Sequence, residues 1–100
     1  MTRRLHSIQP ATEEFEAAVG WYEERRRGLG VEFYEAVSNS IALIAEQPEI
    51  GTVIGGVGST RRILVSRFPY QVVYHLTPTD IVIVAVAHLK RRPNYGRDRH

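Results

Sequence analysis

The stretch from Arg61 to His88 reads RRILVSRFPYQVVYHLTPTDIVIVAVAH, and its composition is typical of a β-sheet. It is rich in β-branched and aromatic residues, and two proline-containing segments interrupt it, which predicts three strands joined by turns. Residues 81–87 are apolar at every position, as expected of a strand that is covered on both faces. We therefore expect an antiparallel meander with strands at residues 62–68, 70–76 and 81–88.

Two amphipathic helices are predicted before this meander. Apolar residues recur at helical spacing from Thr12, the expected N-cap, to Arg27. A second helical pattern begins near Phe33 and ends before Pro48, because proline cannot continue a helix. The segment from Gly28 to Gly30 connects the two, and so short a connection makes the helices antiparallel neighbours. The sequence thus predicts a helix hairpin.

Two further segments complete the predicted fold. Residues 5–9 alternate weakly between apolar and polar types, which indicates a short edge strand that ends at Pro10. Residues 48–60 contain four glycines and no apolar period, so we expect a mobile loop; the glycines precede a strand, whereas phosphate-binding loops precede a helix. The chain is therefore predicted to be a single domain, residues 1–100, of the α+β class. Its element order is β-α-α-β-β-β, with the helix hairpin packed on a mainly antiparallel four-stranded sheet.

The composition fits one small globular domain. The chain has 100 residues, of which 43% are hydrophobic and 24% charged, and it contains no cysteine, which excludes disulfides. It begins without the apolar core of a secretory signal, and its longest apolar run is too short to cross a bilayer, so we expect a soluble cytoplasmic protein that does not engage membranes. Histidines, serines and carboxylates do not fall at the spacing of metal sites, serine triads or carboxylate pairs, so no metal and no cofactor is expected.

The charges are sorted along the chain, although the net charge is only +2. Residues 1–50 carry five arginines against nine glutamates, a net charge of −4, whereas residues 51–100 carry eight cations against two aspartates, a net charge of +6. Arginine binds carboxylate or phosphate through two parallel hydrogen bonds. We expect a positive groove along the β-rich half that receives an acidic partner or a nucleic acid; a solvated basic face is the alternative.

Two motifs on this plan resemble a known family. The first, RRILVSRFPYQVVY, runs from Arg61 to Tyr74, and the second, IVAVAHLKRRPNY, runs from Ile83 to Tyr95. In this order, after a strand and a helix hairpin, they are similar to the RelE/ParE superfamily of toxins from bacterial type II toxin-antitoxin modules. They look most like the ParE branch, often labelled plasmid stabilisation proteins. The resemblance covers nearly the whole chain and implies a hetero-oligomer with a cognate antitoxin, whose acidic C-terminal segment wraps the toxin.

The resemblance implies two mechanisms, and the sequence leaves both open. ParE-type members inhibit DNA gyrase, which we favour, whereas RelE-type members cut messenger RNA on the ribosome with basic residues and a tyrosine. A degenerate, non-toxic member that only binds its antitoxin is a third possibility, so enzyme status is undecided. The chain departs from the RelE branch in having a single lysine, Lys90. Candidate catalytic residues, by resemblance, are Arg62, Arg67, His88, Arg91 and Tyr95. Candidate residues for binding the target or the antitoxin are Arg61, Arg62, Arg67, Tyr70, Arg91 and Arg92.

His88 has both a structural and a functional interpretation. It shares sequence parity with Val82, Val84 and Val86, which predicts a place at the rim of a buried face. There a histidine either completes the packing or acts as a general acid or hydrogen-bond donor near neutral pH. Tyr74, by contrast, is predicted to belong to the core.

Overall fold

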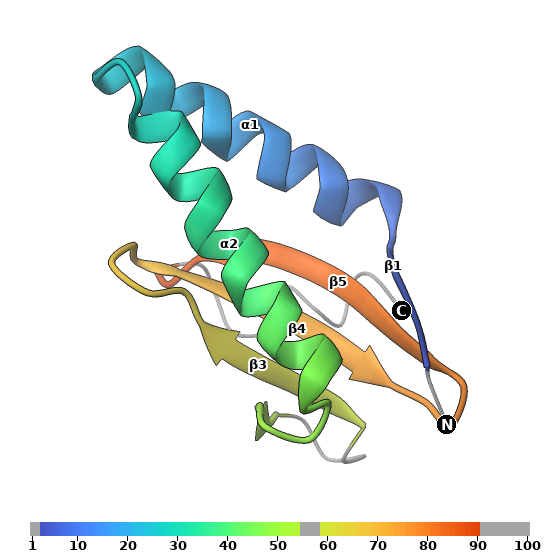
Figure 1. Cartoon of the computed structure of the whole chain (residues 1–100). Helices are drawn as coiled ribbons and strands as arrows, with labels where there is room; N and C mark the ends of the chain where they lie inside the picture. Colours follow the sequence, from blue (N-terminus) through green and yellow to red (C-terminus); the bar gives the residue numbers. More distant parts are fainter. Residues whose placement is uncertain (1–2, 55–58, 91–100) are drawn as a thin grey trace.

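The computed structural model describes residues 3–54 and 59–90, which form two layers (Figure 1). Two helices cover one face of a five-stranded sheet whose strand order is β1-β5-β4-β3-β2. The elements are β1 (Arg4–Ser7), α1 (Gln9–Arg25), α2 (Leu29–Glu46), β2 (Thr52–Val53), β3 (Thr60–Leu64), β4 (Tyr70–Leu76) and β5 (Asp80–His88). The predicted α+β architecture, a helix hairpin on a sheet, is confirmed. No helix in the described ranges is long and apolar enough to cross a membrane.

The sheet is mixed and has five strands, where the sequence predicted four. β1 runs parallel to the first half of β5, and every other pair of neighbours is antiparallel. The additional strand, β2, pairs two residues with β3 inside the segment that was predicted to be a loop. Two residues are too few to show a period in sequence. β3 also ends earlier than predicted, at Leu64, because the chain turns toward β4 at Arg67, whose φ is 73°.

β5 lies between β1 and β4, and its interior position agrees with its uninterrupted apolar sequence. A register shift divides this strand into two halves. Val73 of β4 opposes Ala85, whereas the next residue, Tyr74, opposes Ile83, so β5 contains one residue more than β4 at this point. Such a β-bulge reverses the alternation of the side chains that follow it. Ile83 and Val86 therefore both belong to the core under the helices.

The bulge corrects the predicted parity of His88. Val82 opposes His75 on the face away from the helices, whereas His88 opposes Tyr70, which packs against the helix-side core. His88 thus shares its face with Val86 but not with Val82. The predicted place at the rim of a buried face holds, because His88 is half-buried.

α1 begins three residues before the predicted start. Its N-cap is Ile8, and Pro10 occupies the first turn, where a missing N–H costs nothing because the first N–H groups of a helix have no partner within it. Thr12, the predicted N-cap, lies inside the helix, and its hydroxyl hydrogen-bonds the Ser7 hydroxyl at 2.8 Å. Pro10 was predicted to end a strand, but proline is also favoured in the first turn of a helix, where the structure places it.

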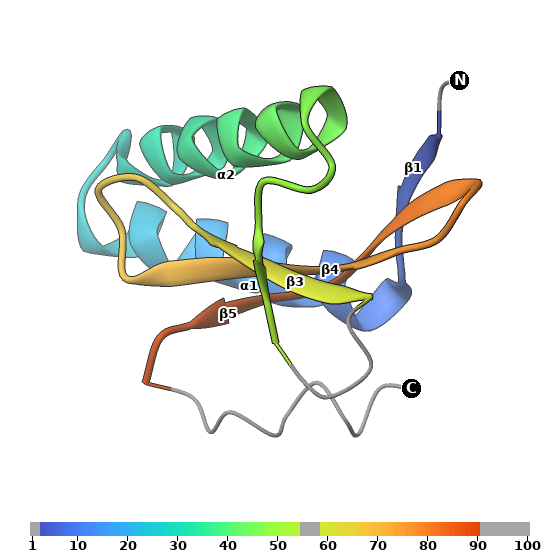
Figure 2. The same cartoon turned by 90° about the horizontal axis from the view of Figure 1, so that it is seen from below.

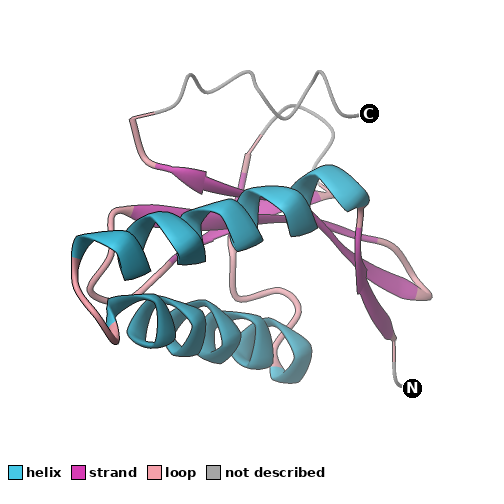
Figure 3. Ribbon diagram, turned by 90° about the horizontal axis from the view of Figure 1, so that it is seen from above, coloured by secondary structure: helices cyan, strands magenta, loops and turns pink. Residues whose placement is uncertain are grey.

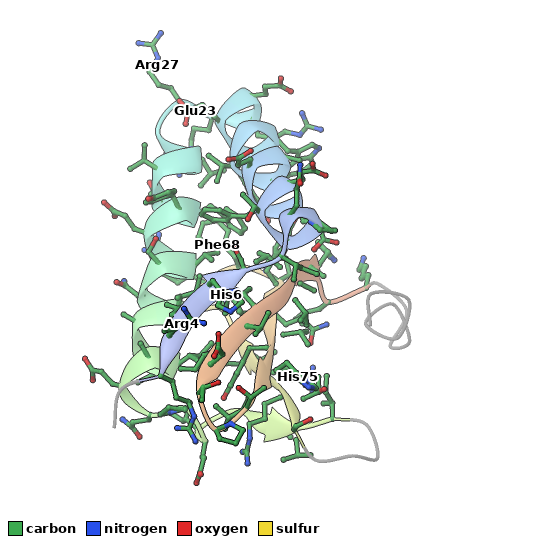
Figure 4. All side chains as sticks on the ribbon, turned by 90° about the vertical axis from the view of Figure 1, so that its right-hand side faces the viewer. Arg4, His6, Glu23, Arg27, Phe68 and His75 are labelled. Atoms are coloured by element: carbon green, nitrogen blue, oxygen red, sulfur yellow. The ribbon has the colours of Figure 1, made fainter. Side chains whose placement is uncertain are left out.

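The two helices run antiparallel and side by side on the sheet (Figure 3). Their connection is Arg26 to Gly28 rather than the predicted Gly28 to Gly30, since α2 already begins at Leu29. Gly28 adopts a φ of 90°, a conformation that favours glycine. The Glu23 carboxylate, at the hairpin tip in Figure 4, accepts hydrogen bonds from the N–H groups of Gly28 and Gly30 at 3.0–3.1 Å. A carboxylate of α1 therefore caps the N-terminus of α2.

The core lies between the hairpin and β4 and β5. Phe33 and Val37 of α2 are fully buried against it, as is Tyr74 of β4, which confirms the predicted place of that tyrosine. An aromatic cluster extends the core toward the turn between β3 and β4: Phe68 packs edge-on against Tyr22 at 5.0 Å between ring centroids and against Phe33 at 5.2 Å. Figure 4 shows Phe68 beneath the two helices. Full burial of such a ring contributes roughly 1.5–3 kcal/mol, and the partly buried Phe68 gains a fraction of this, so the cluster holds this turn against the hairpin.

Candidate functional site

Arg61 and Arg62 are neighbours on β3, so their side chains project to opposite faces of the sheet. Arg61 opposes Tyr74 on the helix side. Its Nη1 donates hydrogen bonds to the backbone carbonyls of Glu49 at 2.8 Å and Gly51 at 2.9 Å. The Nε atom of this side chain is buried and has no hydrogen-bond partner. Arg61 is thereby committed to the segment that joins α2 to β2.

Tyr74 fixes the same segment from the core. Its hydroxyl donates to the Pro48 carbonyl at 2.7 Å and accepts the Gly51 N–H at 2.9 Å, while the residue is 0% exposed. A Cβ on Gly51 would lie 2.6 Å from that hydroxyl, so the glycine is needed for the close approach. Figure 2 shows this segment leaving α2 and passing the sheet beside β3. The expected mobile loop is therefore anchored at its beginning; residues 55–58 lie outside the described part of the chain.

Arg62 lies on the opposite face, across from Val73. Its Nη1 donates to the Gln71 Oε1 atom at 3.2 Å. Gln71 is only 7% exposed, so its amide oxygen requires a donor of this kind. A guanidinium with five donors keeps further hydrogen-bonding capacity beyond this one contact.

Arg67 lies in the turn between β3 and β4, at the edge of a groove between α2 and β3. Its Nη2 donates to the Glu32 Oε1 atom at 2.9 Å, and Glu32 Oε2 lies 3.4 Å from Nη2 of Arg26. The Arg67 side chain is 70% exposed. The groove beside it has a volume of about 390 Å³ and includes Ile63 and Leu43 in its lining. Arg67 is thus held loosely by one carboxylate next to an apolar depression.

Tyr70 and His88 are brought together. They oppose each other in the β4–β5 ladder, with ring centroids 5.3 Å apart in an edge-to-face arrangement. The Lys90 N–H donates to the His88 Nδ1 atom at 3.1 Å, which leaves Nε2 for another contact. Both rings line a second groove, of about 690 Å³, between α1 and β5. Tyr22 lines it too, and burial, with a smaller contribution from Tyr70, raises the pKa of Tyr22, so its hydroxyl stays protonated at neutral pH.

The edge of β3 is partly uncovered. β2 pairs with Arg61 and Arg62, and no described strand continues beside Leu64. The Val65 N–H donates to the Tyr70 carbonyl at 2.9 Å, so Val65 faces β4, and the preceding N–H and C=O groups, those of Leu64, point away from β4. The Leu64 side chain is 57% exposed. Leu64 therefore presents backbone groups and an apolar side chain at one place on the edge.

The described arginines do not form the single positive groove that the sequence predicted. Arg61 contacts backbone carbonyls on the helix side, Arg62 lies on the other face, and Arg67 extends from the turn toward α2. Their separation follows from strand alternation at residues 61 and 62 and from the turn at residue 67. Arg91, Arg92 and Tyr95 lie outside the described residues.

Two side-chain contacts of the β-rich half were not predicted, because their partners are acidic residues of the helices. Glu32 is 35 positions away from Arg67 in sequence, and Glu14 of α1 accepts the Val86 N–H of β5 at 3.1 Å from 72 positions away. No local pattern marks such partners. The excess of glutamate in the N-terminal half was visible, and the structure shows that part of it serves the β-rich half.

Comparison with known proteins agrees with this fold. The chain is similar to a structure of the chromosomal ParDE toxin-antitoxin system from P. aeruginosa, with a TM-score of 0.74 and 12% identity over 87% of this chain and 96% of that one. It is also similar to a mutant of the E. coli toxin RelE in complex with an antitoxin RelBc peptide, with a TM-score of 0.67 and 18% identity over 98% and 95% of the two chains. At these identities the likeness concerns the fold. No sequence among the curated proteins matches this one.

The family assignment follows from the sequence itself. Residues 9–93 match the model of the ParE toxin of type II toxin-antitoxin systems, parDE. This range contains α1 and α2, all strands except β1, and both motifs on which the resemblance was based, apart from the last two residues of the second. The chain therefore belongs to the family of ParE toxins of type II toxin-antitoxin systems.

Proposed function

We propose that this chain is a cytoplasmic toxin that inhibits DNA gyrase by binding to it, and that a cognate antitoxin with an acidic C-terminal segment neutralises it. The observation that carries the choice of gyrase is the dispersal of the three candidate catalytic residues within the described part of the chain. Arg62 lies on one face of the sheet, Arg67 extends from the turn toward α2, and His88 lines the groove beside α1. Acid-base cleavage of RNA needs a phosphate-binding cation and a proton-transferring group within hydrogen-bond reach of the same substrate atoms. Among the described residues these groups are apart, which favours a toxin that acts by binding.

A supercoiling assay tests the proposal directly. Purified toxin should block supercoiling of relaxed plasmid by gyrase or trap cleaved DNA, and equimolar antitoxin should reverse the effect. Arg67→Ala should weaken inhibition, because it removes an exposed guanidinium, while Arg67→Lys serves as a matched control that keeps the charge at the same position. Uninhibited supercoiling at a large excess of toxin that is lethal in cells would overturn gyrase as the target. Harmless expression without antitoxin would instead identify a degenerate member.

A ribosome-dependent ribonuclease is the second candidate, and the contact between Tyr70 and His88 favours it. Their rings lie 5.3 Å apart beside a groove, and His88 keeps Nε2 for proton transfer. Primer extension on translated messages would then reveal new ends at codon positions, and His88→Ala would abolish both the ends and the toxicity. If His88→Ala leaves toxicity intact, this candidate is eliminated.

The antitoxin is proposed to bind along the uncovered edge of β3. An extended segment there would accept and donate main-chain hydrogen bonds at Leu64 and place side chains in the groove between α2 and β3. An acidic side chain of this segment would exchange with Glu32 on Arg67, at little cost because an exposed ion pair contributes only about 0–1 kcal/mol. The partner is therefore a polypeptide that alternates apolar and acidic residues.

Two substitutions of Leu64, with opposite charges, test whether the segment that binds at this edge is acidic. Leu64→Asp and Leu64→Lys both replace an exposed apolar side chain, so both should fold, which circular dichroism checks. We expect Leu64→Asp to weaken antitoxin binding roughly tenfold more than Leu64→Lys, since only the aspartate repels an acidic segment. Equal affinities of the two variants for the antitoxin, measured by calorimetry, would exclude this edge.

A further inference from the structure

The groove between α1 and the second half of β5 is lined by aromatic rings and carboxylates, which favour cations, whereas the arginines described above favour anions. Its volume is about 690 Å³, and it is the larger of the two grooves described above. Rings form much of its wall, and two carboxylates of α1 stand beside them. The residues concerned are Trp21, Tyr22, Tyr70, His88, Glu13 and Glu14.

The rings suit a flat cation. Trp21 is 48% exposed, and its ring already carries the guanidinium of Arg25, whose central carbon lies 4.0 Å from the ring centroid. Tyr22 meets Trp21 edge-on at 5.1 Å and meets Tyr70 at 6.0 Å, so the rings form a continuous series. Aromatic faces attract cations through their quadrupole, and arginine also stacks on them by its planar shape.

The carboxylates add the complementary charge. α1 carries five glutamates and one arginine, and two of those glutamates, Glu13 and Glu14, line the groove. Glu14 accepts the Val86 N–H at 3.1 Å, and Glu13 accepts a hydrogen bond from the Gln9 amide at 3.1 Å, so both carboxylates are fixed in position. The other titratable side chains in the groove are Tyr22, Tyr70 and His88. Rings next to ionised carboxylates attract a guanidinium or an ammonium and repel an acidic segment.

We propose that this groove binds an arginine side chain of a partner polypeptide. The guanidinium stacks on the exposed ring of Trp21 and pairs with the carboxylates of Glu13 and Glu14, while a neighbouring apolar residue of the partner packs on Ala17, an exposed residue of the groove lining. Arginine is preferred to lysine because only its planar group stacks and bonds at once. This groove lies between α1 and β5, whereas the proposed antitoxin edge is at β3. The proposal does not depend on whether gyrase is the target.

The single tryptophan of the chain, Trp21, reports directly on the groove. The probe is a blocked five-residue peptide with one arginine between two leucines, titrated into the full-length chain with its fluorescence as the readout. The control peptide carries citrulline, which has the shape of arginine without the charge. We expect saturable binding of the arginine peptide, at least fivefold weaker binding of the citrulline peptide, and weakening of the former in 0.5 M salt. Equal binding of the two peptides would overturn the proposal.

Matched variants locate the site. The double change Glu13→Gln with Glu14→Gln removes both charges and leaves one acceptor oxygen in each side chain, so the amide oxygen at position 14 can still accept the Val86 N–H. We expect it to weaken arginine-peptide binding about tenfold, whereas Glu16→Gln with Glu24→Gln, the same double change on the same helix outside the groove, leaves binding within twofold. Equal effects of the two would show that only the general charge of α1 matters and would overturn the site.

The basic residues that follow β5 are the competing occupants. The variant Arg91→Gln with Arg92→Gln removes the two arginines nearest the end of that strand. If the groove receives a partner, peptide affinity stays within threefold of the unchanged chain. If peptide binding becomes detectable only in this variant, the chain's own arginines fill the groove and the proposal of a partner is overturned.

Discussion

Arg61 and Arg67 belong to one sequence motif, yet the structure uses them in opposite ways. Arg61 donates to two backbone carbonyls beside the fully buried Tyr74, and its Nε is itself buried. Arg67 is 70% exposed and bonds one carboxylate from a turn. A guanidinium that satisfies carbonyls of the fold stabilises the shape of the chain. One that rests on an exposed carboxylate can exchange that carboxylate for a ligand's anion. The acceptors of an arginine, rather than its place in a motif, therefore indicate its role.

Removing the hydroxyl of Tyr74 should cause the largest loss of stability, because this hydroxyl anchors the segment between α2 and β2. Tyr74→Phe leaves the Pro48 carbonyl and the Gly51 N–H without their partner, and two such losses in a buried place cost about 2–3 kcal/mol. Urea unfolding should show a lower midpoint for the variant, with an unchanged dependence of the unfolding free energy on urea concentration. Tyr34→Phe is the matched control, because Tyr34 is exposed, and it should cost less than about 0.5 kcal/mol. Similar losses for both tyrosines would refute the anchor.

Arg61→Ala should have the second-largest effect. We expect it to lower the free energy of unfolding by about 1–2 kcal/mol, since two hydrogen bonds from a charged donor disappear at a partly buried position. Arg62→Ala provides the comparison on the other face, where a single bond to Gln71 is lost, and its cost should be roughly half as large. Thermal unfolding of both variants measures the ratio. A larger loss for Arg62→Ala than for Arg61→Ala would reverse the assignment of the anchored arginine.

The backbone conformation of Arg67 can be tested separately from its guanidinium. Its φ of 73° lies in the left-handed region, which glycine adopts more easily than alanine, so Arg67→Gly should be about 1 kcal/mol more stable than Arg67→Ala, although both lose the ion pair. Both variants should be less toxic in cells than the unchanged chain, because both lack the guanidinium. Full toxicity in either would contradict the proposed role of Arg67 in binding. Equal stability would contradict the role of its backbone conformation.

The smallest effect concerns the pairing of β1 with β5. Hydrogen bonds from the Thr79 hydroxyl and from His6, together with the charge of Arg4, lower the pKa of the Asp80 carboxyl, and Figure 4 shows Arg4 and His6 on β1. A lowered pKa in the folded state means that this contribution is complete above the unfolded pKa and is lost as the pH falls through the folded one. Asp80→Asn should therefore flatten the acid side of the stability-pH curve. An unchanged acid limb would show that the carboxyl contributes nothing.

The fold could be predicted because its large elements carry strong periods. The stripe through Phe33, Val37 and Ile44 and the apolar run of β5 identified the hairpin and the interior strand. Pro10 was misinterpreted because proline suits both the end of a strand and the first turn of a helix. β2 is too short to have a period, so it could not be found.

The site could be predicted only in part. Tyr70 and His88 were singled out, and the ladder brings them together. The opposite directions of Arg61 and Arg62 follow from strand alternation, because neighbouring residues of a strand project to opposite faces, whereas their shared charge suggested a common groove. The acidic partners, such as Glu32 for Arg67, come from elements far away in sequence, so only the packed structure reveals them.

The bulge in β5 matters for anyone who transfers residue roles between relatives of this chain. Because Val73 and Tyr74 oppose Ala85 and Ile83, the count from Ile83 to the next helix-facing position, Val86, is three rather than two. Consider a relative whose corresponding strand has no bulge. A gapless alignment that begins at Ile83 would equate His88 with a residue of that relative that projects to the other face of the sheet. Superposition of the strands, not counting along them, is the sound basis for such a transfer.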